Sequence, residues 1–129
     1  MSTYSRYGES INIENFECPS YVFDFLRHCL IGKNLSKNTL TNYYVTLLSF
    51  LRYIQGRAQK IEVTKDNITN IDVSELPFKV VSQITSNDVK EYIYFAANTL
   101  ENKPSSRQQK LTIISIFYEY LVDNELIDY

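Results

Sequence analysis

Six apolar residues recur at helical spacing in segment 40–54, and they limit what this chain can fold into. They are Leu40, Tyr44, Leu47, Leu48, Leu51 and Ile54. Intervals of three and four residues place side chains on one face of an α-helix, whereas a strand alternates its faces every second residue. The segment therefore predicts a long amphipathic helix that begins after an N-cap at Ser36 and ends near Gln55 or Gly56.

Two further segments predict helices on either side of the long one. The earlier helix is expected to begin near Pro19–Ser20 and to end at Gly32, since glycine takes the left-handed conformation that closes many helices. The later helix is expected to begin at Thr85 or Ser86, with Asp88 in its first turn, where negative charge complements the helix dipole. The apolar face of this later helix is predicted to consist of Val89, Ile93, Ala96, Ala97 and Leu100.

A fourth helix is predicted after Pro104, with Ser105 or Ser106 as its cap. Its apolar residues cover more than one face, which is typical of a helix buried on several sides. We expect it to be the central helix of the bundle or one that also contacts a partner. These residues are Leu111, Ile113, Ile114, Ile116, Phe117, Tyr118, Tyr120, Leu121 and Val122.

Segment 57–84 lacks a helical period. "KIEVTKDNITNIDV" carries β-branched residues around a "KDN" turn, which suits a short hairpin or a long loop, and Pro77 interrupts the segment beside a short helical turn. The sequence thus predicts an all-α fold of four helices with one irregular insertion between the second and third. Residues 1–18 are expected to be a tail that orders only in part, and residues 19–129 one domain.

Composition excludes several classes of function. A length of 129 residues with 44% apolar residues fits one globular domain. With His28 as the sole histidine and Cys18 and Cys29 far apart, the chain lacks the clusters that bind zinc, so we expect neither metal nor cofactor. No leader and no apolar run of about 20 residues is seen, which predicts a cytoplasmic protein with reduced thiols and no membrane contact.

Charge is distributed unevenly although the net charge is only -2. No acid occurs between Asp24 and Glu62, and none between Glu101 and Glu119. The cations of these two acid-free segments are Arg27, Lys33, Lys37, Arg52, Arg57 and Lys60, and then Lys103, Arg107 and Lys110.

Each acid-free segment holds the start of a predicted helix rich in hydroxyls, amides and cations, "SKNTLTNY" and "SSRQQK". Helix N-termini bind phosphate oxygens through free amides and the positive end of the dipole, and such side chains are the usual donors to nucleic acid. Polar first turns are also ordinary helix chemistry. The pattern therefore favours a nucleic-acid contact without excluding a purely structural role.

The order of these segments resembles the core-binding domain of tyrosine recombinases, the phage-integrase type of site-specific recombinase. "YVFDFLRHCLIGKNLSKNTLTNYYVTLLSFLRYI" is similar to its first two helices, "ITSNDVKEYI" to its third and "SSRQQKLTIISIFYEYLVDNELI" to its last. The resemblance covers residues 19–128 and implies a SAM-like orthogonal four-helix bundle that clamps one side of double-stranded DNA through its second and fourth helices. The matching DNA-binding positions are Lys33, Ser36, Lys37, Asn38, Thr39, Asn42, Tyr43, Ser105, Ser106, Arg107, Gln108 and Lys110.

The chain departs from the family in lacking its catalytic motifs. His28 has no arginine three residues on, and no arginine cluster surrounds Tyr129. We therefore expect a non-catalytic domain that works with a catalytic domain of the same parent chain and with other recombinase protomers on DNA. The alternatives are a helical protein-interaction module and a standalone regulatory DNA-binding protein.

Overall fold

The computed structural model describes residues 17–128, and all regular structure in this range is helical. The elements are α1 (Ser20–Gly32), α2 (Lys37–Ala58), the 3-10 turn η3 (Ile68–Asn70), α3 (Phe78–Ser82), α4 (Ser86–Asn98) and α5 (Pro104–Asp123). The predicted all-α class and the four main helices are confirmed. The expectation of a hairpin in segment 57–84 is wrong, since this segment is a loop that contains η3 and α3. Most of the expected tail, residues 1–16, lies outside the described residues.

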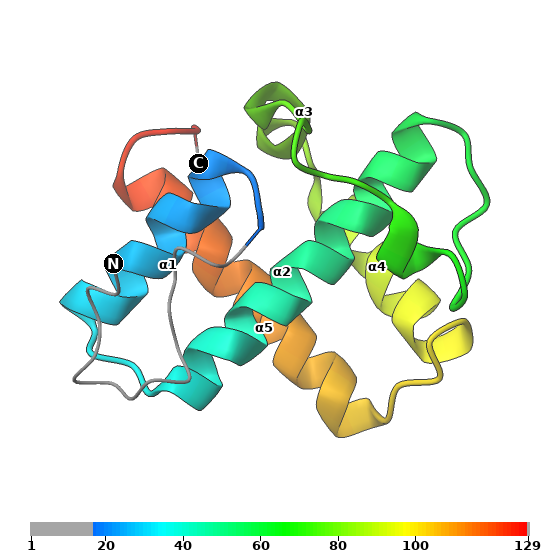
Figure 1. Ribbon diagram of the computed structural model, residues 1–129, viewed down its shortest axis with the longest axis horizontal. Helices are drawn as coiled ribbons and strands as arrows, with labels where there is room; N and C mark the ends of the chain where they lie inside the picture. The colour runs from blue at the N-terminus through cyan, green and yellow to red at the C-terminus, as the bar shows by residue number, and fades with distance from the viewer. Residues whose placement is uncertain (1–16, 129) are drawn as a thin grey trace.

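The two longest helices, α2 and α5, cross near their middles (Figure 1). Helix α1 packs against α2, and α4 packs against α5. The core contains large aromatic side chains from all four helices. Phe25 of α1 meets Phe117 of α5 with ring centroids 5.2 Å apart, and Phe50 of α2 meets Tyr92 of α4 at 5.3 Å. All four side chains are fully buried, so they form one core along the crossing.

Tyr92 is buried although its hydroxyl is polar, and Ser49 of α2 satisfies that hydroxyl through a hydrogen bond of 2.7 Å. Burial raises the pKa of Tyr92 to about 12. The sequence pattern missed Tyr92, because it predicted a different face of α4 as the core face. Of that face only Ala96 is buried, while Val89 and Ile93 remain partly exposed.

Two helices begin with side-chain caps. Ser36 caps α2 by accepting from the backbone N–H of Thr39 at 3.2 Å, as predicted. Thr85 caps α4 in a reciprocal capping box with Asp88, which settles the choice between Thr85 and Ser86. Helix α2 runs on to Ala58, beyond the predicted end, because Gly56 tolerates helical geometry and the insertion packs directly over it.

Left-handed residues follow the C-terminal ends of all four main helices. They are Asn34, Lys60, Glu101 and Glu125, with φ angles of 56° to 59°. At three of these helix ends a backbone N–H also donates to the carbonyl five residues earlier, as Ile61 N–H does to the Gly56 carbonyl at 2.8 Å. The expectation that Gly32 takes this conformation is wrong. Gly32 is the last helical residue of α1, and Asn34 adopts the left-handed geometry, which asparagine tolerates well.

Two tyrosine hydroxyls hold the insertion against the bundle. Tyr21 of α1 donates to the Leu76 carbonyl at 2.7 Å, and Tyr118 of α5 donates to the Val81 carbonyl at 2.8 Å. A Cβ placed on Gly56 would collide with Val63 of the insertion, so the backbone of α2 is approached closely there. The insertion is thus a fixed part of the domain and not a loose loop.

Helix α5 is central, yet it is less enclosed than its composition predicts. Four of its residues are buried, namely Ile113, Ile114, Phe117 and Leu121. Thr112, Ser115 and Glu119 form an exposed polar edge, and Leu111 remains 37% exposed. The expected role of α5 as the central helix is therefore confirmed, while its contact with a partner stays a prediction.

Within residues 17–128 no helix has the length and apolarity needed to cross a membrane. The same residues contain no group of three or more His, Cys, Asp or Glu side chains arranged to hold a metal ion. Cys18 and Cys29 form no disulfide bond, and burial raises the pKa of each to about 11.

Candidate nucleic-acid interface

The N-terminus of α2 (residues 36–42) is a closed cap. The Ser36 hydroxyl accepts from the Thr39 N–H and donates to the Thr39 side-chain oxygen at 2.9 Å. Ser36 and Thr39, both predicted site residues, thus satisfy each other first. A ligand at this end would meet the side chains that project from the first two turns more readily than the backbone amides.

Those projecting side chains are polar. Lys37, Asn38 and Asn42 are exposed, and the described part of the chain offers no hydrogen-bond partner to either asparagine side chain. Thr41 and Val45 lie on the same exposed face, with Val45 at 54% exposure. The sequence reading missed both, although spacings of three, four and seven residues from Asn38 would have found them. Amides beside an exposed methyl surface can read base edges and thymine methyl groups.

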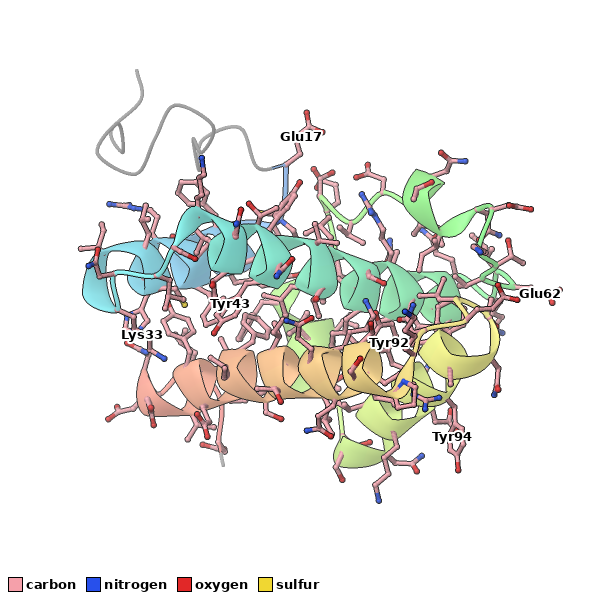
Figure 2. All side chains as sticks on the ribbon, turned by 90° about the horizontal axis from the view of Figure 1, so that it is seen from below. Glu17, Lys33, Tyr43, Glu62, Tyr92 and Tyr94 are labelled. Carbon is pink, nitrogen blue, oxygen red and sulfur yellow. The ribbon has the colours of Figure 1, made fainter. Side chains whose placement is uncertain are left out.

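Two other predicted residues have structural roles. The Tyr43 ring stacks on Phe25 with centroids 6.0 Å apart and planes 7° from parallel, and burial raises its pKa. Figure 2 shows Tyr43 pointing between the helices and not out from α2. Lys33 is exposed at the C-cap of α1, where its positive charge complements the helix dipole.

The N-terminus of α5 (residues 103–110) is open, in contrast to that of α2. Lys103 is the N-cap residue and makes no side-chain cap, and Pro104 occupies the first helical position. The expectation that Ser105 or Ser106 caps this helix is therefore wrong, because Pro104 takes the first helical position and the N-cap falls at Lys103, two residues before Ser105. Residues 17–128 provide no acceptor for the backbone N–H of Ser105 or of Ser106.

The side chains around this open end carry no negative charge. Gln108 is exposed, Arg107 is half-buried, and neither has an ion-pair partner in the described range. Lys110 is partly buried, and desolvation lowers its pKa without a nearby carboxylate to offset it. Gln109 and Thr112 extend the polar surface and were missed, since the sequence reading stopped at the first turns. Two orphan amides, two hydroxyls and two cations suit a phosphate group.

Both N-termini lie at the same edge of the domain, the lower edge of the view in Figure 1. The N-terminus of α4 differs in chemistry, because Asp88 occupies its first turn. Hydrogen bonds from the Arg57 side chain and the Thr85 backbone hold the pKa of Asp88 below its usual value. A stable carboxylate there repels phosphate, whereas the first turns of α2 and α5 are polar and contain no acid.

Ion pairing further concentrates the positive charge toward that edge. Arg57, at the far end of α2, pairs with Asp88 at 2.8 Å and Glu91 at 3.4 Å, and its guanidinium lies 5.4 Å from the centre of the Tyr53 ring. Its charge is thereby largely neutralised. At the start of α5, Arg107 and Lys110 form no ion pair with a residue of the range 17–128, which is the setting expected of a surface that binds a polyanion.

Comparison with known proteins gives one match. A family model described as "Phage integrase, N-terminal SAM-like domain" matches residues 22–128, which include every helix of the structure except the first two residues of α1. Neither the search of curated proteins nor that of solved structures found a match.

Proposed function

Because the chain belongs to the phage integrase N-terminal SAM-like domain family, whose members bind DNA, we propose that it clamps one side of a duplex recombination site through α2 and α5. The observation that carries this proposal is the position of two acid-free helix N-termini at one edge of the domain. Together the two N-termini offer two anchoring points for the DNA backbone.

The two N-termini are proposed to contribute differently. At α5, the free amides of Ser105 and Ser106 bind a phosphate group, and Arg107 and Lys110 supply the charge. At α2, Lys37 contacts phosphate, and Lys33 approaches the backbone from the end of α1.

Recognition of the DNA sequence is assigned to the amide side chains. Asn38 and Asn42 of α2 and Gln108 of α5 have both donors and acceptors free for base edges in the major groove. Ser36 and Thr39 hold the α2 N-terminus in shape, and Tyr43 supports it from the core through Phe25. These three residues act as positioning groups, so their substitution should change stability together with affinity.

The domain is proposed to work without catalysis of its own, as half of a clamp. The partners that fit are duplex DNA, a catalytic domain of the same parent chain and neighbouring recombinase protomers. Reading the coding sequence beyond Tyr129 for a domain that carries H-x-x-R and a nucleophilic tyrosine tests this arrangement.

The DNA proposal is tested by salt-dependent binding to a labelled duplex. If about four phosphates are contacted, affinity should fall roughly a hundredfold between about 50 and 200 mM salt. Lys37→Ala and Arg107→Ala should each weaken binding and reduce the salt slope by about 1. Lys79→Ala removes an exposed lysine of the insertion and is the matched control, expected to change neither quantity.

The outcome also separates the alternative functions. Binding that is insensitive to salt and to both substitutions would exclude the DNA clamp and leave a protein-interaction module. Binding that depends on salt but is altered as much by Lys79→Ala as by Lys37→Ala would place the DNA on another face.

A further inference from the structure

An apolar groove runs between α4 and α5, and nothing in the described chain covers it. It consists of two adjoining hollows of about 360 and 370 Å³ that share Lys90 and Leu111. Its apolar lining comes from the face of α4 that the sequence assigned to the core, together with the exposed part of α5. The principal side chains are Ile84, Val89, Ile93, Tyr94, Ala97 and Leu111.

This groove has a definite charge. Lys90 lines both hollows and Arg107 one of them, and no Asp or Glu lines either. Tyr94 is 71% exposed and points away from the body of the domain in Figure 2. An exposed apolar floor with cationic walls fits a segment in which an apolar side chain is flanked by carboxylates.

The chain itself contains such a segment directly after α5. Leu126 is 49% exposed, and Asp123, Glu125 and Asp128 around it are all exposed. None of the three carboxylates forms an ion pair with another residue of the range 17–128. Glu125 takes a left-handed conformation (φ 58°), which turns the chain away from the helix axis at this point.

A copy cannot place this segment in its own groove. Leu111 and Leu126 are separated by most of α5, which at a rise of 1.5 Å per residue amounts to about 20 Å along a rigid helix. Figure 1 shows the two ends of α5 on opposite sides of the domain. The groove and the segment can therefore meet only between two molecules.

We propose that the α4–α5 groove of one copy receives segment 123–128 of a second copy. Leu126 enters between Leu111 and Tyr94, and a flanking carboxylate pairs with Lys90, which lines both hollows. The contact is head-to-tail, because it joins two different surfaces, and such contacts build chains or closed rings of protomers. It needs no DNA and is independent of the proposed DNA clamp.

Sedimentation velocity of the 129-residue chain without DNA tests the proposal. The contact is small, so we expect weight-average mass to rise between about 10 µM and 1 mM, as is typical of weak interfaces. Lys90→Glu alters the groove and Leu126→Asp alters the segment, and each variant alone should stay monomeric across that range. Both residues are exposed, so both variants should keep the circular dichroism and melting temperature of the parent chain.

Mixing the two variants gives the decisive result. The Leu126→Asp chain keeps an intact groove and the Lys90→Glu chain an intact segment, so the mixture should form dimers and nothing larger. A parent chain that is monomeric at about 1 mM would overturn the proposal. Self-association that survives Leu126→Asp, or a mixture that stays monomeric, would overturn it too. Leu126→Asp should leave duplex binding unchanged, so the DNA clamp is judged separately.

Discussion

The two long helices of this domain are anchored in opposite ways. Helix α2 begins at a closed cap formed by Ser36 and Thr39, and its last turn is covered by the insertion at Gly56 and paired with α4 through Arg57. Helix α5 begins without a side-chain cap and is followed by an exposed acidic segment. Both helices contribute to one core, yet only α2 combines a side-chain cap at its start with an insertion packed over its last turn.

This contrast indicates different roles for α2 and α5. A helix whose terminal groups are satisfied by its own chain contributes stability, whereas unsatisfied terminal amides remain available to a ligand. Helix α2 then serves as the scaffold that presents side chains, and α5 as the helix whose ends take part in binding. The following predictions test that contrast, in order of decreasing effect.

Gly56→Ala should be the most destabilising change, lowering the free energy of unfolding by roughly 1–3 kcal/mol. The new Cβ would collide with the branched side chain of Val63, which has little rotamer freedom to move aside. Urea unfolding measures the effect. Gly32→Ala is the matched control, because its Cβ would meet only the His28 ring at 3.8 Å, and it should be neutral or stabilising.

Ser36→Ala should cost about 1 kcal/mol of stability by removing the cap of α2. Ser105→Ala at the start of α5 should change stability by less than about 0.5 kcal/mol, because Ser105 caps nothing. The same unfolding experiment compares the two serines. Equal losses would show that the two helix N-termini are not anchored differently.

Lys103→Ser should separate stability from DNA binding at α5. A serine cap would satisfy one of the two free amides and make this variant about 1 kcal/mol more stable than Lys103→Ala, which removes the same charge. If those amides bind phosphate, Lys103→Ser should also bind duplex DNA several-fold more weakly than Lys103→Ala, since 1.4 kcal/mol corresponds to about tenfold. Affinity and stability that rise together would contradict the role assigned to the open helix end.

Asp88→Asn should have a smaller, pH-dependent effect of roughly 0.5 kcal/mol at neutral pH, in line with a charge at a helix N-terminus. The folded-state pKa of Asp88 is lowered, mainly by the hydrogen bond from Arg57. Its contribution is therefore complete above the unfolded pKa of about 3.9 and disappears as pH falls through the lower folded value. The parent and variant curves of stability against pH should converge below about pH 4. A constant difference down to pH 2 would show that charge is not the cause.

Sequence reasoning succeeded where a local pattern decides the structure. Ser36 and the Leu40–Ile54 stripe of α2 were identified because helical spacing and hydroxyl caps act within a few residues. The start of α5 was misread for an equally local reason, as Pro104 competes with the serines that follow it. Gly32 was misread because the helix ends there while the left-handed turn falls two residues later, at Asn34.

The rest depended on tertiary contacts that no local pattern reveals. Helix α4 has two apolar faces, and only packing against Phe50 and Ser49 selects the one that contains Tyr92. The groove beside Leu111 likewise depends on how α4 and α5 pack against each other. The candidate DNA-binding residues were thus located by sequence, while their division into positioning and contacting groups required the structure.

The left-handed residues after the helices leave room for engineering. Lys60, Glu101 and Glu125 adopt a backbone geometry that glycine occupies at no steric cost. A thermostable form of the domain could therefore be sought at Lys60 and Glu101 alone, without altering either helix N-terminus or the segment around Leu126. Natural chains rarely exhaust such substitutions.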